Sequence, residues 1–248
     1  MVDSKNRQIL AIADNGLLAP NITELHFKDD GVNGSYKYIG SNAMGDLSDS
    51  SNFAINTIVF PDTLEKIGRY AFYNLDKLVH INLPESITHI YDSAFGATFK
   101  EMHLQLTELP PNLVWLGAGA FTNNKDITIN SLPSGLRTIE SNVFAWCDRV
   151  VISEFGSDDG EGLESIGISA FLNAGIAAPK PQFVTFNESV YSIVNSPDMN
   201  GINSSFAGSY LGKASIITFK NDHIHTIVGD TLYGLIDDDD NPPQIELI

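Results

Sequence analysis

The chain has 248 residues and a formal net charge of −17, from 31 acidic and 14 basic side chains. Such a negative field repels phosphate backbones, and no cluster of Lys and Arg reverses it locally, so nucleic acid is not expected as a partner. No apolar run reaches the roughly 18 residues of a membrane-spanning helix, so we expect no membrane insertion.

The first 31 residues precede the regular part of the sequence, and we expect residues 1–31 to form an N-terminal cap or a first strand. The start of the chain is charged, and no apolar segment of signal-peptide length follows closely, which predicts that no secretory signal is present. The localisation stays open: extracellular or at the cell surface if a leader has been removed, and cytoplasmic or virion-associated otherwise.

Residues 32–236 repeat one apolar pattern, Φ-Pro-x-x-Φ-x-x-Φ-x-x-x-Ala-Phe, in which Φ is an apolar residue. Repetition at this length is typical of a solenoid, in which each unit buries its apolar side against its neighbours. We expect about seven to eight units of 23–35 residues, the less regular ones at both ends. The clearest copies end at residues spaced 23, 26, 23 and 27 positions apart: Phe72, Phe95, Phe121, Phe144 and Phe171.

An alternating segment upstream of the proline position predicts a short strand in the units, and proline, which has no N–H for a ladder, ends it. The Φ-x-x-Φ segment that follows is predicted to be a tight turn or a 3₁₀ segment. Asp92 and Ser93 are expected to start a short helical turn that ends the unit. The predicted strands are residues 56–60, 79–83, 102–106, 127–130, 183–186 and 217–219.

The units resemble the BspA-like leucine-rich repeat family, with the closest matches at residues 64–72 and 163–171, both of the form Leu-Glu-x-Ile-Gly-x-x-Ala-Phe. This resemblance implies a curved solenoid without catalytic machinery, in proteins of the cell surface or secreted proteins associated with adhesion. The predicted fold class is therefore a leucine-rich-repeat solenoid, α/β but mostly β. Short parallel strands would stack in one curved sheet, with turns, 3₁₀ segments or short helices on the other side and a stack of Phe rings in the core.

Three segments depart from the regular repeat. Residues 156–162 replace the apolar-proline pair of one unit with a Gly-rich and acidic loop, and residues 195–201 interrupt another unit. Residues 237–248 begin with an acidic run and end in a short apolar stretch that is a candidate for a closing strand. These interruptions are where we expect the individual character of the protein.

The cysteine and histidine residues form no catalytic or metal-binding pattern. Cys147, the single cysteine, excludes an intrachain disulfide and fits a small buried position better than a nucleophile. His223 and His225 alternate on a predicted strand but lack a third ligand, so we interpret them as a polar strand edge. His80 and His103 take outward positions in adjacent units and are expected near each other on the sheet.

The acidic runs at residues 29–31, 158–161 and 237–240 contain carboxylates suited to Ca²⁺. None has ligands at the alternating positions of a calcium-binding loop, so we interpret them as solvated turns. Sequence motifs for nucleophilic, phosphate-binding and zinc-dependent catalysis are absent as well. We therefore expect neither catalysis nor a metal or other cofactor.

The outward residues of the predicted strands are the candidate contact surface for a partner, because solenoids commonly bind through such extended faces. We expect a protein or glycan partner, and self-association is possible. The competing hypothesis is a structural or decoration subunit of a larger assembly, such as a viral particle or an appendage. The candidate partner-binding residues are Thr57, Val59, His80, Asn82, His103, Gln105, Thr128, Asn130, Thr185 and Thr218.

Overall fold

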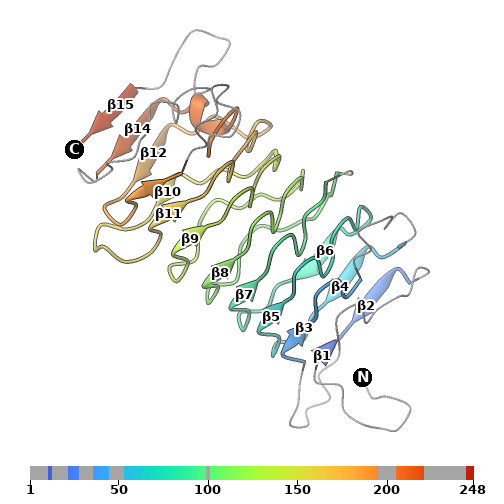
Figure 1. Ribbon diagram of the computed structural model, residues 1–248. Coiled ribbons are helices and arrows are strands. Elements are labelled where there is room, and N and C mark those ends of the chain that lie inside the picture. The colour runs from blue at the N-terminus through green and yellow to red at the C-terminus, as the bar shows by residue number, and fades with distance from the viewer. Residues whose placement is uncertain are drawn as a thin grey trace.

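The computed structural model describes residues 11–12, 22–27, 36–44, 53–98, 101–194, 205–220 and 244–248, which wind into an elongated solenoid of short strands and turns (Figure 1). The stack runs from β1 and β2 at one end to β15 at the other. Some predictions lie outside the described residues: the acidic runs at 29–31 and 237–240, His223, His225, the insertion at 195–201 and the domain boundaries at 31/32 and 236/237.

One side of the solenoid is formed by strands from the alternating segments, and we call it the first ladder. All its strand pairs are parallel, and buried residues such as Ile58 and Ile217 alternate with outward ones. Two sheets make up this side, β2-β4-β6 and β10-β12-β14-β15. The strands are β2 (Glu24–His26), β4 (Thr57–Val59), β6 (His80–Asn82), β10 (Glu154–Phe155), β12 (Phe183–Phe186), β14 (Ile216–Phe219) and β15 (Gln244–Leu247).

Between β6 and β10 the first ladder is reduced to isolated contacts. The strands predicted at residues 102–106 and 127–130 are therefore wrong, although both segments keep alternating buried and exposed residues. The longer unit in this region places Gln105, rather than the predicted His103, opposite His80. This shift of register leaves only single bridges in place of the series of bonds that a strand pair needs.

A second set of parallel strands, the second ladder, is formed where the Φ-x-x-Φ segment was predicted to be a tight turn or a 3₁₀ segment. The backbone N–H groups of Glu65 and Lys66 both donate to the Lys37 carbonyl oxygen of the preceding unit at 3.0 Å. Such bonds between units take the donors that a 3₁₀ segment would use within one unit, so the ladder forms instead. The strands are β1 (Ala11–Ile12), β3 (Tyr38–Ile39), β5 (Lys66–Ile67), β7 (His89–Ile90), β8 (Trp115–Leu116), β9 (Thr138–Ile139), β11 (Ser165–Ile166) and β13 (Ser192–Ile193).

The predicted fold class, a mostly β solenoid of parallel strands, is confirmed. The strands lie in four hydrogen-bonded sheets on two sides of the solenoid, however, and not in one sheet. Among the described residues the one helix is the 3₁₀ helix η2 (Tyr210–Lys213), so the units are closed by turns.

Left-handed residues lie on both sides of the terminal Phe in four closing turns, and before it at Phe95. The short helical turn predicted at Asp92 and Ser93 is not formed. Ser93 has a φ of 50°, which a right-handed helix cannot accommodate. Two residues before the aromatic position, or before Met44 in an early unit, the left-handed residues are Asn42, Tyr70, Ser93, Gly119, Asn142 and Ser169. Two residues after the Phe they are Asn74, Asn123, Trp146, Asn173 and Gly208.

The turns of adjacent units are joined by backbone hydrogen bonds that share one direction at the terminal Phe positions. The N–H of Phe72 donates to the Ala94 carbonyl oxygen at 2.9 Å, and that of Phe95 donates to Ala120 at 2.9 Å. At the terminal Phe positions the earlier unit is therefore the donor, whereas in the ladders both units donate: Lys66 donates to Lys37 of the preceding unit, and Phe27 donates to Val59 of the following one.

The terminal Phe side chains form the predicted aromatic stack in the core. Successive ring centroids from Phe72 through Phe95, Phe121 and Phe144 to Phe171 are 5.3, 5.7, 6.1 and 5.5 Å apart, and all five residues are fully buried. Stacking at these distances stabilises the contacts between units beyond the burial of apolar surface alone.

Buried polar groups next to this stack bond to the backbone of neighbouring turns. The Asn124 side-chain amide donates to the carbonyl oxygens of Phe95 at 2.8 Å and Phe121 at 2.9 Å. In the next unit the Cys147 thiol takes the same position and donates to Phe121 at 3.1 Å. Cys147 is fully buried, in agreement with its interpretation as a structural residue.

Candidate functional site

All ten outward positions proposed from the sequence have side chains that reach the surface of the first ladder. The structure places four of them in a half-buried state: Thr57, Val59, Thr185 and Thr218. The other six are exposed: His80, Asn82, His103, Gln105, Thr128 and Asn130.

The register brings some of these residues together and separates others. Thr57 lies opposite His80, and Thr185 lies opposite Thr218. His103 does not lie directly opposite His80, because His80 is bridged to Gln105. The imidazole Nδ1 of His103 instead lies 2.9 Å from a carboxylate oxygen of Asp126 in the following unit.

Asn82 already has a structural role, although its side chain is exposed. The backbone N–H of Phe60 donates to the Asn82 amide oxygen at 2.6 Å, and the Asn82 amide nitrogen donates to the Phe60 carbonyl oxygen at 3.0 Å. This pair of bonds satisfies the backbone beyond the end of β4, where Pro61 ends the strand. Asn82 is therefore a weaker candidate for a partner contact than its exposure alone suggested.

Thr128 and Asn130 line a groove of about 450 Å³ on the first ladder. Its floor continues across the next unit through Arg149, Val151 and Ser153, and residues 177–181 form its wall. The alternation predicted the floor residues Thr128 and Asn130 but not the wall, because residues 177–181 belong to no repeat. An Ala-Pro-Lys-Pro stretch just before a predicted strand was the signal in the sequence that could have indicated an ordered, non-ladder segment.

Gly175 directs the chain from the closing turn toward this wall. It has a φ of 67°, and a Cβ atom placed on it would lie 2.7 Å from the side chain of Tyr210 and from the Val150 carbonyl oxygen. Only glycine fits both constraints. The Tyr210 hydroxyl in turn bonds to the backbone N–H and carbonyl oxygen of Ile152 at 3.0 and 2.9 Å, and burial raises the pKa of this hydroxyl. The groove is thus supported by a packed and hydrogen-bonded base.

Two basic side chains line the groove, although the protein as a whole is acidic. Arg149 lies on its floor and Lys180 in its wall. The guanidinium Nε of Arg149 is 3.4 Å from a carboxylate oxygen of Asp126, which holds the Arg149 side chain along the ladder surface. The polar and cationic groups of the lining can donate hydrogen bonds to carboxylate, carbonyl or hydroxyl oxygens of a bound molecule.

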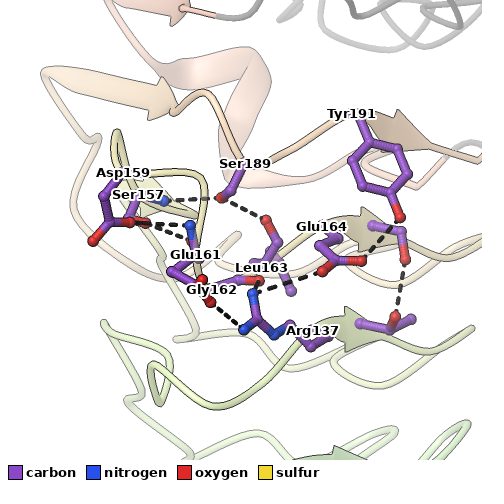
Figure 2. A network of polar contacts seen from close by, with 11 residues as sticks. Arg137, Ser157, Asp159, Glu161, Gly162, Leu163, Glu164, Ser189 and Tyr191 are labelled. Atoms are coloured by element: carbon purple, nitrogen blue, oxygen red, sulfur yellow. Dashed lines mark hydrogen bonds and ion pairs between the residues drawn. The ribbon is translucent and has the colours of Figure 1, made fainter.

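The loop at residues 156–162 has a structural explanation (Figure 2). The carboxylate of Asp159 accepts hydrogen bonds from the Ser157 hydroxyl and from the backbone N–H of Glu161, which lower its pKa. Arg137 pairs with Glu161 and donates to the Gly162 carbonyl oxygen at 3.2 Å.

The same network continues into the neighbouring unit. The Ser189 hydroxyl accepts a hydrogen bond from the backbone N–H of Ser157 at 3.0 Å and donates one to the Leu163 carbonyl oxygen at 2.8 Å. The Tyr191 hydroxyl donates to the Glu164 carboxylate at 2.9 Å. These contacts support the interpretation of the acidic run at 158–161 as a structural turn.

Within the described ranges, no group of three or more His, Cys, Asp or Glu residues is arranged to hold a metal ion. Within the same ranges, no helix has the length and apolar character needed to cross a membrane.

Comparisons with known proteins agree with this geometry. Residues 37–177 match the family model of the BspA type leucine-rich repeat region in six copies. A leucine-rich repeat protein from Bacteroides ovatus has a similar structure, with a TM-score of 0.51 and 18% identity over 96% of this chain and 55% of that protein. The chain therefore spans about half the length of this structural relative.

Two further structures align with lower scores. The Treponema pallidum (T. pallidum) leucine-rich repeat protein gives a TM-score of 0.44 at 20% identity, covering 71% of this chain and 85% of that one. The pneumococcal vaccine antigen PcpA gives a TM-score of 0.42 at 17% identity, covering 90% of this chain and 66% of that one. No curated protein sequence matches the chain.

Proposed function

Because the chain belongs to the BspA-type leucine-rich repeat family, we propose that it is a non-catalytic recognition module that binds a protein or glycan through its first ladder. Leucine-rich repeat solenoids generally serve in protein interactions, and their extended faces supply the contact surface. Adhesion is the biological role that this binding would support.

The observation that carries the proposal is the groove that contains Thr128 and Asn130. Its volume of about 450 Å³ suits a peptide side chain or a sugar residue. The lining is mainly apolar, and the polar groups of Thr128, Asn130 and Arg149 can fix the orientation of either. Arg149 and Lys180 can pair with acidic groups of a partner segment, and the negative charge of the rest of the protein would confine such groups to the groove. The mixture of threonine, asparagine and basic side chains does not resemble an acid–base or nucleophilic constellation.

The groove can be tested by reversing its charge and filling it. We expect the double variant N130E and R149E to lose at least nine-tenths of its capture of a binding partner isolated from the native source, because both changes repel acidic groups. The matched control is S134E, which adds a negative charge at an exposed turn residue outside the groove. Capture measured by surface plasmon resonance that is equal for the double variant and S134E would refute the groove as the contact site.

A further inference from the structure

At the position two residues after the terminal Phe, the closing turns hold one residue that does not fit its backbone conformation. Tyr70, the other bulky left-handed residue, lies before the Phe and packs edge-on against Tyr73. The second residue after the terminal Phe is left-handed in five units, where four of the residues are Asn or Gly: Asn74, Asn123, Asn173 and Gly208. These two residue types tolerate positive φ at little cost. In the fifth unit the position is Trp146, with a φ of 62°.

Packing does not explain this tryptophan. Its neighbours Phe144 and Cys147 are fully buried and fill the core, whereas Trp146 is 45% exposed. The backbone N–H of Trp146 donates to the Leu172 carbonyl oxygen at 2.7 Å, just as the N–H of Asn123 donates to Ala145 at 2.8 Å. The turn is therefore held by bonds that do not need an indole. A bulky side chain kept in a strained and exposed position indicates a functional role.

The indole forms one wall of a cavity of about 430 Å³ on the turn side of the solenoid, away from the groove of the first ladder. The other lining side chains include Thr98, Glu101, Thr122, Asn123 and Lys125. A smaller cavity of about 260 Å³ adjoins it and shares Thr98 and Thr122. Together they form a trough across the closing turns of neighbouring units, which we call the turn trough.

Polar groups in the turn trough are fixed beside the indole. The Lys125 ammonium lies 5.9 Å from the Trp146 ring centroid and is held by Asp148 at 3.1 Å and Glu101 at 3.8 Å. The Thr122 hydroxyl donates to the Asn142 carbonyl oxygen at 2.5 Å. The trough thus combines one flat aromatic surface with oriented hydroxyl, amide, carboxylate and ammonium groups.

This combination matches the chemistry of a sugar ring. A pyranose has an apolar face of C–H groups that stacks on an indole, and a rim of hydroxyl groups that need both donors and acceptors. Among the described lining residues of the wider cavity, the indole and Ala97 are apolar and the others are polar or charged, so hydrogen-bonding groups surround one aromatic face. Glu101 and the net charge of −17 disfavour acidic sugars. We propose that the turn trough binds a neutral saccharide, with Trp146 as its stacking surface.

The test uses W146N, which places at this position the residue that neighbouring units use. Neutral hexose and N-acetylhexosamine oligosaccharides would be screened on a glycan array, and hits titrated by intrinsic fluorescence in a W115F background. Trp115 and Trp146 are the two tryptophans of the chain, so Trp146 is then the sole indole reporter. We expect saturable binding with a change in emission in W115F. For W146N, binding would be measured by calorimetry, and we expect it to be at least tenfold weaker. The melting temperature of W146N should be unchanged or higher.

Controls separate this site from the groove and from a folding defect. W115A removes the other exposed indole, on β8, and R149E alters the groove, so both are expected to keep saccharide binding. Absence of binding to every neutral oligosaccharide, or equal binding by W146N and the wild type, would overturn the proposal. If W146N loses only the capture of a protein partner, Trp146 is a protein contact and the saccharide site is refuted.

Discussion

Cys147 shows how one side chain serves the contact between two units. Its thiol donates to the Phe121 carbonyl oxygen, and burial raises its pKa to about 12 from an ordinary value near 9. We expect Cys147 to resist iodoacetamide at pH 8 in the folded protein and to react fully in denaturant, measured by mass spectrometry. Alkylation of the folded protein at the rate of the denatured chain would contradict this burial.

The same pKa shift predicts a loss of stability at high pH. Above about pH 9 the thiol ionises in the unfolded chain but not in the folded one, so the unfolded state binds fewer protons. The contribution of Cys147 is therefore complete below about pH 9 and is lost as the pH rises toward 12. A Cys147→Ala variant should show a smaller fall in the free energy of unfolding between pH 8 and pH 10 in urea titrations. Equal slopes for the two proteins would contradict the assignment.

Phe95 is the residue on which the aromatic stack can be tested. It is fully buried between Phe72 and Phe121, with ring centroids 5.3 and 5.7 Å away. We expect Phe95→Ala to lower the free energy of unfolding by about 3–5 kcal/mol, because a cavity replaces the ring. Urea denaturation measures this loss, and Phe95→Leu should cost clearly less. A loss below about 1 kcal/mol for Phe95→Ala would show that the stack contributes little.

At the scale of elements, the alternating pattern predicted most of the first ladder but not the second. Strands such as β4 and β6 follow from period-two alternation that ends at proline. Two-residue strands such as β5 and β7 are too short to show alternation, and their bonds depend on the neighbouring unit. The left-handed turns could not be predicted at Tyr70 and Trp146, because these residue types rarely adopt a positive φ, whereas Asn and Gly commonly do.

In the candidate site as well, the sequence predicted the residues whose orientation depends on their own strand, but not those brought in from other units. Alternation identified Thr128 and Asn130 as outward residues, since their orientation is a property of the strand itself. Arg149, Lys180 and the wall at 177–181 join them only through the stacking of units and the bend at Gly175. The sequence alone contains no spacing that encodes this approach.

Gly175 provides a test of that bend. Gly175→Ala would combine positive φ with contacts of 2.7 Å to buried groups, whereas Gly160→Ala has a φ of 80° and nothing within 4 Å of the added atom. We expect Gly160→Ala to cost about 1 kcal/mol and Gly175→Ala at least about 1 kcal/mol more, since both are strained but only one clashes. Thermal and urea unfolding of the pair measure the difference. Equal losses would mean that the bend at Gly175 adapts without strain.

For the whole molecule, net charge is the main unfavourable electrostatic feature. With 31 acidic and 14 basic side chains, self-repulsion acts on the compact state and is screened by salt. We expect the melting temperature to rise by roughly 2–5 °C between 10 mM and about 300 mM NaCl near pH 7. The rise should shrink at lower pH, where carboxylates are protonated. A melting temperature that falls with salt would indicate that the ion pairs outweigh the repulsion.

The shared direction of the hydrogen bonds at the terminal Phe positions affects the electric field along the turn side of the solenoid. In an α-helix all peptide dipoles point the same way and sum to partial charges at the termini. Here the N–H groups at the terminal Phe positions, such as Phe72 toward Ala94, point toward the C-terminal end, whereas those of the ladders point both ways, as with Lys66 toward Lys37 and Phe27 toward Val59. The dipoles of the ladders therefore largely cancel along the axis, while those at the terminal Phe positions add. Each further unit therefore extends a row of aligned dipoles along the turn side, and the positive end of this row lies toward the C-terminal end of the solenoid, where its N–H groups point.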